Sequence, residues 1–223
     1  MMNYTDILND PIIINKLADI DEHNANQFNH GLGHVKNVMA NMIKLAKLLA
    51  IDKNELNYLL IACVLHDLGQ REGSEEHYLR SKTIAANYLK DKIDPKWFNI
   101  IVLSIENHHD KNNVAHLSLF EHLVLFADKM DFTFQRLDVN YLKQNPIDYL
   151  ESHILDVNFE IVEGTFNVIV TIDQNLNQND LANWSYYPKI EKRIEEFAAK
   201  LKLGYLIQFE VPVKDKTSIN YHL

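Results

Sequence analysis

The sequence has little that would cross-link the chain or break it into short elements. It contains one cysteine, six glycines and five prolines in 223 residues. A single cysteine, Cys63, excludes a disulfide within the chain and a zinc site built from several thiolates. We expect Cys63 to be a small core residue. Few glycines and prolines mean few breaks, which favours long helices.

Basic residues are in the minority, and no apolar run is long. The 22 Lys and Arg stand against 31 Asp and Glu, for a formal charge of −9. A broad basic face for a nucleic-acid backbone is therefore not expected. The longest nearly uncharged apolar run, from Leu56 to Leu65, is shorter than the roughly 20 residues that span a bilayer. The first residues lack a signal-peptide layout, so we expect a soluble, cytoplasmic protein.

Apolar residues recur every three or four positions through most of the first 150 residues, which predicts a helical array. The expected helices cover 11–19, 32–50, 53–68, 74–91, 95–108, 117–131 and 146–156. Ser74 is the expected N-cap of the helix over 74–91. The breaks fall where glycine, proline, Asp and Asn gather, for example at Gly31 and between Gly69 and Gly73.

Beyond about residue 157 the apolar period changes to two. The run FEIVEGTFNVIVTI alternates around Glu163-Gly164, which predicts a β-hairpin. A helix that ends at Gly204 and a third strand, YLIQFEVPV, follow. We therefore expect a helical domain over 1–157 and a ββαβ appendage over 158–223 packed on it. The appendage core is expected to contain Phe159, Val168 and Phe209, and its role as a lid, a selector of substrate or a homodimer contact stays open.

The eleven histidines are the unusual feature of the composition. Four of the expected helices carry a buried stripe that ends in His or Asp, and a fifth begins with His. These end residues are His34, His66, Asp67, His77, His108, His109 and Asp128. His30 is a rival of His34 because it lies four residues earlier. The remaining histidines are expected at the surface: His23, His116, His122, His153 and His222.

Interior carboxylates at Asp67 and Asp128 need partners, because burying an unpaired carboxylate is costly. The partners available at the stripe ends are neutral imidazoles rather than Lys or Arg. A divalent cation binds both carboxylate oxygens and imidazole nitrogens, so it would satisfy such a cluster. A mixed His and Asp shell suits iron, manganese, zinc or cobalt.

Three segments resemble the H…HD…D signature of the HD-domain superfamily: His34 in HGLGHVKNV, His66-Asp67 in LLIACVLHDLGQR, and Asp128 in LFADKMD. Members of that superfamily are helical, metal-dependent phosphohydrolases. The resemblance covers roughly residues 20–140 and does not include the appendage. It implies a mainly α fold, an HD-domain helical bundle to which the small α+β appendage is added.

The resemblance also implies which residues would bind metal. His34, His66, Asp67 and Asp128 would hold one ion, and Asp67 would bridge to a second ion held by His77 and His108. His109 is a further candidate, since some members have a tandem HH. The segment between Asp67 and His77 is shorter than in several dinuclear members, so one ion and two ions both stay open.

The activity that this resemblance implies is hydrolysis of a phosphoester or phosphoanhydride by a metal-activated water, with Asp67 as ligand and orienter. Arg71, Arg136 and Lys129 are candidates to bind the substrate phosphate, the arginines more so because guanidinium binds phosphate bidentately. The acidic balance favours a small substrate such as a nucleotide over a long polyanion. Two alternatives stay open: an HD-fold di-iron oxygenase with the same ligand shell, and a non-catalytic signalling module.

Overall fold

The contacts within the chain divide it into two compact units. The computed structural model describes residues 2–23, 29–109, 114–137, 146–173, 184 and 186–212. The first unit holds the described residues up to Asp128, and the second holds those from Lys129 onward. This division falls earlier than the expected boundary at 157, because residues soon after Asp128 pack within the second unit: the Phe132 and Trp184 rings lie 5.5 Å apart.

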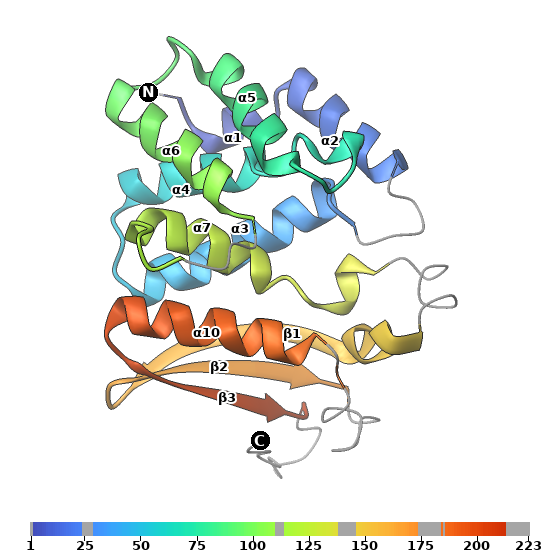
Figure 1. Cartoon of the computed structure of the whole chain (residues 1–223), viewed down its shortest axis with the longest axis vertical. Helices are drawn as coiled ribbons and strands as arrows, with labels where there is room; N and C mark the ends of the chain where they lie inside the picture. Colours follow the sequence, from blue (N-terminus) through green and yellow to red (C-terminus); the bar gives the residue numbers. More distant parts are fainter. Residues whose placement is uncertain are drawn as a thin grey trace. The chain divides into compact units, whose positions relative to one another are not determined.

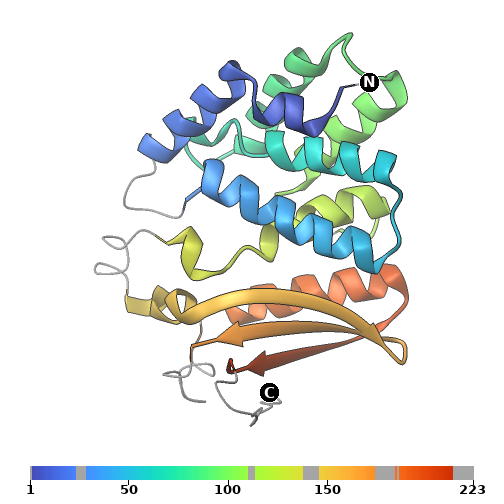
Figure 2. The same ribbon diagram turned by 180° about the vertical axis from the view of Figure 1, so that it is seen from behind.

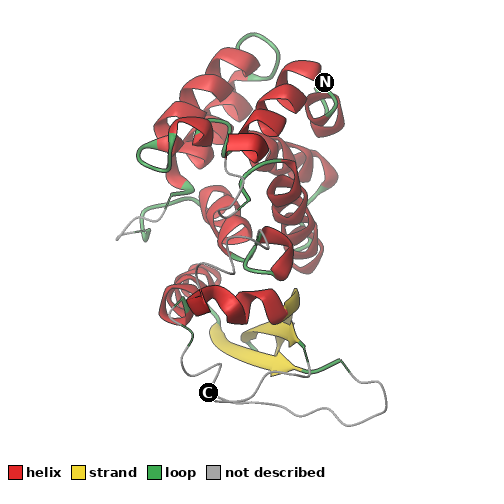
Figure 3. Cartoon of the chain, turned by 90° about the vertical axis from the view of Figure 1, so that its right-hand side faces the viewer, coloured by secondary structure: helices red, strands yellow, loops and turns green. Residues whose placement is uncertain are grey.

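In its described part, the first unit consists of helices and their connections (Figures 1 and 3). The helices are α1 (Tyr4–Leu8), α2 (Pro11–His23), α3 (Leu32–Leu48), α4 (Lys53–Leu65), the short 3-10 helix η1 (Gln70–Glu72), α5 (His77–Leu89), α6 (Pro95–Asn107) and α7 (Leu119–Lys129), which ends at the boundary. Among the described residues, no helix is both long and apolar enough to cross a membrane.

Side-chain caps explain where several of these helices begin. Asp52 accepts hydrogen bonds from the first backbone N–H groups of α4, and Asp94 does the same for α6, where Pro95 follows. The expected cap of α5 is wrong. Glu76, with a left-handed φ of 53°, precedes α5, and Ser74 lies further back in the loop.

Helix α4 is the centre of the first unit, and it packs against α1, α3 and α6. Figure 2 shows α3 running beside it. Every residue from Tyr58 to Leu65 is buried, so the expected one-sided stripe is in fact a helix covered on all sides. Cys63 is fully buried, as expected, and burial raises the pKa of its thiol. This placement carries His66 and Asp67, which follow α4, into the interior.

The second unit contains a three-stranded sheet with one long helix on a face (Figure 1). Its elements are η2 (Phe134–Arg136), η3 (Pro146–His153), β1 (Ile154–Val162), β2 (Thr165–Ile172), α10 (Tyr187–Leu201) and β3 (Gly204–Glu210). The strand order is β1-β2-β3, with β1 antiparallel and β3 parallel to β2. The parallel pair needs a crossover connection, and α10 supplies it. The mainly α fold with a ββαβ appendage is confirmed.

The hairpin turn lies where it was expected. Glu163 and Gly164 both have positive φ angles, 49° and 81°, as a two-residue turn of the I′ type requires. The helix expected over 146–156 is wrong: a 3-10 helix ends at His153, and Ile154 already pairs with Ile172 of β2. Strand pairing with a neighbour distant in sequence thus overrides the local helical pattern.

Two details of the appendage also differ from expectation. Helix α10 ends at Leu201, and its C-cap Lys202 has a left-handed φ of 60°, whereas Gly204 begins β3. Val168 and Phe209 are buried as expected, but Phe159 is only half-buried. Phe166 takes the core position instead, with its ring 5.3 Å from that of Phe197 on α10.

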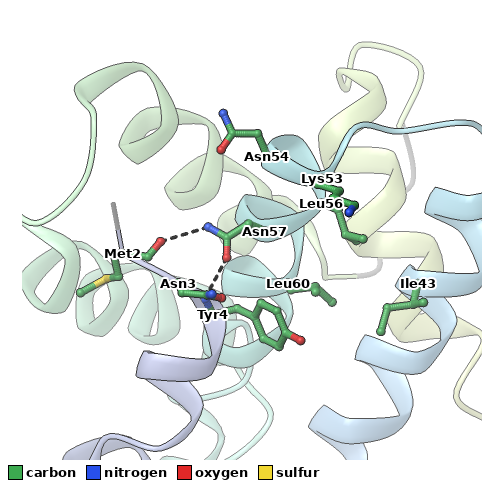
Figure 4. Close-up of a pocket in the computed structure, with 9 residues that line it drawn as sticks. All are labelled: Met2, Asn3, Tyr4, Ile43, Lys53, Asn54, Leu56, Asn57 and Leu60. Atoms are coloured by element: carbon green, nitrogen blue, oxygen red, sulfur yellow. Dashed lines mark hydrogen bonds between the residues drawn. The ribbon is translucent and has the colours of Figure 1, made fainter.

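Asn57 on α4 fastens the N-terminal segment to the bundle beside a cavity of about 470 Å³ (Figure 4). Its Oδ1 accepts from the Tyr4 N–H at 2.9 Å, and its Nδ2 donates to the Met2 carbonyl at 3.0 Å. The cavity is lined by Met2, Asn3, Tyr4, Ile43, Lys53, Asn54, Leu56, Asn57 and Leu60. None of the predicted metal ligands is among these residues.

We expect Asn57→Ala to lower the free energy of unfolding by about 1–2 kcal/mol, because the half-buried N–H and carbonyl lose their partners. Urea unfolding followed by circular dichroism measures the change. Asn54→Ala, at an exposed position on the same helix and cavity, is the control and should change stability by less than about 0.5 kcal/mol. Equal effects of the two variants would contradict this role of Asn57.

Candidate metal centre

The first unit brings the ends of five helices to one point in its interior. His34 lies in the first turn of α3, His66 is the C-cap of α4 with Asp67 next to it, and His77 begins α5. His108 is the C-cap of α6 and Asp128 lies in the last turn of α7. All six side chains are buried. Of the seven predicted ligands, these six form one cluster.

One group of donor atoms surrounds Oδ2 of Asp67. The Nε2 atoms of His34 and His66 lie 3.2 Å apart. Oδ2 of Asp67 lies 3.5 Å from the first and 3.4 Å from the second. Asp128 Oδ1 lies 3.2 Å from His34 Nε2 and 3.7 Å from His66 Nε2. These four side chains, called the first donor set here, could hold one metal ion.

A second group of donor atoms faces the other oxygen of the same carboxylate. Asp67 Oδ1 lies 3.3 Å from His77 Nε2 and 3.2 Å from His108 Nε2. The two Nε2 atoms are 3.0 Å apart. These three side chains are the second donor set. Asp67 therefore offers one oxygen to each set, which is the arrangement a bridging carboxylate needs.

Backbone carbonyls determine which imidazole nitrogens carry hydrogen. Nδ1 of His66 lies 2.8 Å from the Cys63 carbonyl, and Nδ1 of His108 lies 2.5 Å from that of Ile105. A carbonyl oxygen can only accept, so Nδ1 donates and the neutral ring presents the Nε2 lone pair to the cluster. His77 is oriented in the same way by the Ser74 carbonyl at 2.7 Å.

A cation would satisfy lone pairs that face one another at these distances. With the ring hydrogens on the Nδ1 atoms, the Nε2 atoms of His77 and His108, 3.0 Å apart, have no hydrogen to share, and an adjacent carboxylate oxygen adds negative charge. A divalent ion satisfies all three donors, and nitrogen with carboxylate oxygen is a usual ligand combination for first-row transition metals. The residues present therefore fit a divalent metal, and the carbonyl contacts are the outer hydrogen bonds typical of metal-bound histidines.

The electrostatics of the metal-free cluster also favour a cation. Burial lowers the pKa of His66, but the charges of Asp67 and Asp128 outweigh burial and raise that pKa to about 10. Burial raises the pKa of Asp67, and the contacts with His66, His108 and His30 more than reverse this, so the pKa stays well below its usual value. Burial lowers the pKa of His108 to about 4. Asp67 is thus ionised, and a positive charge is retained beside it.

His30 belongs to this cluster, although its position four residues before His34 suggested only a rival of that histidine. Its Nδ1 lies 2.8 Å from Asp67 Oδ2, and its side chain is 21% exposed. Its ring meets that of His34 edge-on, with centroids 5.5 Å apart. The structure places both histidines at the site. The four-residue spacing, which places two helical residues on one side, was the signal in the sequence. It did not require a choice between His30 and His34 as the residue at the site.

His109 lies beside the second donor set. Its half-buried ring stacks on Tyr78 with centroids 5.0 Å apart and meets the His77 ring at 5.3 Å. Its role as a ligand stays a prediction.

The expectation for His122 is wrong. This histidine is buried within α7, and its Nε2 donates to the Val114 carbonyl at 2.8 Å. The loop before α7 covers a helix face that was taken to be open. His23 and His116 are exposed, and His153 is half-buried with Nδ1 3.9 Å from Asp173 Oδ2. His222 lies outside the described residues.

The three basic residues expected to bind phosphate lie in different places. Arg71, in η1, is exposed, and its Nε lies 2.6 Å from Asp19 Oδ2. Lys129 is the last residue of α7, and Arg136 in η2 donates from Nη1 to the Asp131 carbonyl at 2.9 Å. Lys129 and Arg136 both belong to the second unit. The roles of all three stay predictions.

The first unit is a helical domain in which helix ends bring histidines and Asp128 around the Asp67 carboxylate. This arrangement of donors is the one expected of a metal-binding helical domain. Residues 31–133 match the family described as the HD domain. The chain therefore contains an HD domain. The match includes every residue of both donor sets, and His30 lies just before its first residue.

A solved structure described as a predicted HD superfamily hydrolase from an uncultured Thermotogales bacterium is 17% identical, with a TM-score of 0.46. The match covers 90% of this chain and 99% of that one. No curated protein matches this chain.

Proposed function

We propose that this protein is a metal-dependent phosphohydrolase that cleaves a phosphoester or phosphoanhydride of a small, nucleotide-like substrate. The observation that carries the proposal is the position of Asp67, with each carboxylate oxygen facing a different set of imidazole nitrogens. Two ions that share one carboxylate are a frequent arrangement for phosphoryl transfer. Iron, manganese, zinc and cobalt all suit the donors.

Divalent ions bound here would supply an activated water near neutral pH and would neutralise charge on the phosphoryl oxygens. The chain's own residues prepare this site in advance. The carbonyls of Cys63, Ser74 and Ile105 fix three histidine rings with their lone pairs facing inward. The His30 ring, 2.8 Å from Asp67, fixes the orientation of that carboxylate. Because the donors are buried, bulk water does not compete for them.

A small substrate is consistent with the charge of the chain. At −9, the protein carries no excess of basic residues that would hold a long polyanion. Arg71, Arg136 and Lys129 are the proposed phosphate ligands. Arg71 is paired with an exposed aspartate, Asp19, and such a surface ion pair is weak enough to be exchanged for a phosphate.

The proposal predicts metal-dependent hydrolysis by the purified protein. Protein prepared without chelator should contain about one to two transition-metal ions per chain by elemental analysis. With added Mn²⁺ it should hydrolyse at least one compound of a panel of aryl phosphates, nucleotides and dinucleoside polyphosphates. Chelation should stop the reaction, and re-addition of the metal should restore it.

Two results would contradict this prediction. The first is protein that takes up no ion even after reconstitution. The second is protein that binds its ions but hydrolyses nothing on the panel. The matched control is Thr83→Ala, at an exposed position on the outer side of α5, which should behave as the parent does.

A further inference from the structure

The loop that follows the His66-Asp67 doublet is fastened to α5 by two neighbouring side chains, called here the Arg80–Ser81 clasp. The Gly69 N–H donates to Ser81 Oγ at 2.9 Å. Arg80 Nε donates to the Gly69 carbonyl at 3.0 Å, and its Nη2 donates to the Gly73 carbonyl. One guanidinium thus holds both ends of the loop that runs from Gly69 to Gly73.

Loop and helix are in direct backbone contact at Gly69. A Cβ atom at this position would lie 2.6 Å from the His77 carbonyl oxygen and 2.6 Å from the Ser81 nitrogen. Ser81 is fully buried, so its hydroxyl exchanges no hydrogen bonds with bulk water. Because Gly69 has no side chain, α5 can come into contact with the loop backbone. The side chains of Arg80 and Ser81 hold the helix and the loop at that distance.

The clasp acts on the backbone that carries His77. Arg80 and Ser81 lie three and four residues after His77, and therefore on the same side of α5 one turn further on. Ser74, whose carbonyl orients the His77 ring at 2.7 Å, directly follows the clasped Gly73. The clasp therefore holds both the helix that carries this histidine and the carbonyl that selects its tautomer.

The loop is also hydrogen-bonded to Asp67, the residue of the shared carboxylate, which lies two positions before Gly69. The Gln70 N–H donates to the Asp67 carbonyl at 2.9 Å. The clasp thus connects the backbone next to Asp67 with the backbone of His77. The side chains of these two residues lie 3.3 Å apart in the second donor set. The other members of the first donor set lie on α3, at the end of α4 and on α7. No clasp hydrogen bond given above reaches α3 or α7.

We propose that Arg80 and Ser81 are positioning residues that determine whether the second ion binds, by holding His77 against Asp67. This inference rests on the proposed two-ion centre. Substitution of residues that hydrogen-bond to the ligands of a metal site commonly lowers metal affinity about 10- to 100-fold.

Calorimetric titration of the metal-free full-length protein with Mn²⁺, combined with elemental analysis, tests the proposal. Ser81→Ala and Arg80→Lys should weaken the second binding event about 10- to 100-fold and leave the first within about threefold. Arg80→Lys and Arg80→Met should weaken binding of the second ion equally. Lysine keeps the positive charge, but its single ammonium group cannot donate to two carbonyls as the branched guanidinium does. The control Thr83→Ala should bind as the parent does, because the exposed Thr83 hydroxyl donates to the Leu79 carbonyl of the same helix and not to the loop.

Several results would overturn this inference: a parent that binds a single ion, variants that lose both events equally, or an Arg80→Lys protein with unchanged affinities. Urea unfolding of each variant shows whether Ser81→Ala is folded, and if it is not, Arg80→Lys decides the question. The readout is ion binding alone. A parent that binds two ions but hydrolyses nothing would contradict the proposed function and leave the clasp intact.

Discussion

Asp67→Asn is expected to lower the rate of phosphate hydrolysis about 1,000-fold and to remove at least one ion from the protein. The substitution keeps the size of the side chain but removes the charge that both donor sets share. Loss of the metal's Lewis-acid contribution is worth several kcal/mol, and a factor of 1,000 corresponds to about 4 kcal/mol. The measurements are kcat/KM on the best substrate of the panel and metal content by elemental analysis.

Asp94→Asn is the matched control for this substitution. Asp94 caps the helix that carries His108, and asparagine caps as well as aspartate does. The control removes one acid from the same unit while the donor sets stay intact, so its metal content and rate should equal those of the parent. An Asp67→Asn protein that keeps both ions and hydrolyses as fast as the parent would rule out the bridging role.

Metal affinity is expected to rise steeply with pH. Without metal, Asp67 and Asp128 outweigh the effect of burial and raise the pKa of His66 to about 10, so this ring holds a proton at neutral pH. An ion in the first donor set must displace that proton. Asp67 is already ionised, and His108, with its pKa lowered to about 4 by burial, is already neutral. We therefore expect affinity to increase about tenfold per pH unit, or about 100-fold between pH 6 and pH 8.

Titration calorimetry in buffers of different ionisation enthalpy measures both the affinity and the proton released. About one proton should be released when the first ion binds.

The raised pKa of His66 also predicts how the stability of the metal-free protein depends on pH. A raised pKa stabilises the fold fully below about pH 6.5, the unfolded value, and this contribution is lost as the pH rises toward 10. An affinity that does not change with pH would contradict a protonated His66.

The helical period in the sequence was enough to predict most helices and the interior positions of His66, Asp67, His108 and Asp128. An apolar stripe with a period near 3.6 continues along one side of a helix, so a polar residue at its end lies in the interior. The same argument failed for His122, whose helix face is covered by a loop. It also failed for residues 146–156, where pairing with β2 produces a strand from Ile154.

Contacts between residues far apart in sequence decided the rest of the site. His30, just before α3, and His34, in its first turn, both lie near Asp67 Oδ2, at 2.8 Å and 3.5 Å, whereas the spacing suggested a choice between them. Tyr78 on α5 stacks on His109, which follows the C-cap of α6, and neither helix pattern indicates this contact. The Arg80 guanidinium donates to the carbonyls of Gly69 and Gly73, contacts that the helical pattern of α5 does not indicate.

The sequence by itself determined a helical, cysteine-poor domain with histidines and two aspartates at the buried ends of its helices, because residue type and period are local properties. Only the tertiary structure decided which nitrogen faces which carboxylate oxygen, and that Asp67 divides its two oxygens between two donor sets. Those distances depend on how helices approach one another across the core, and backbone contacts such as the one at Gly69 set them.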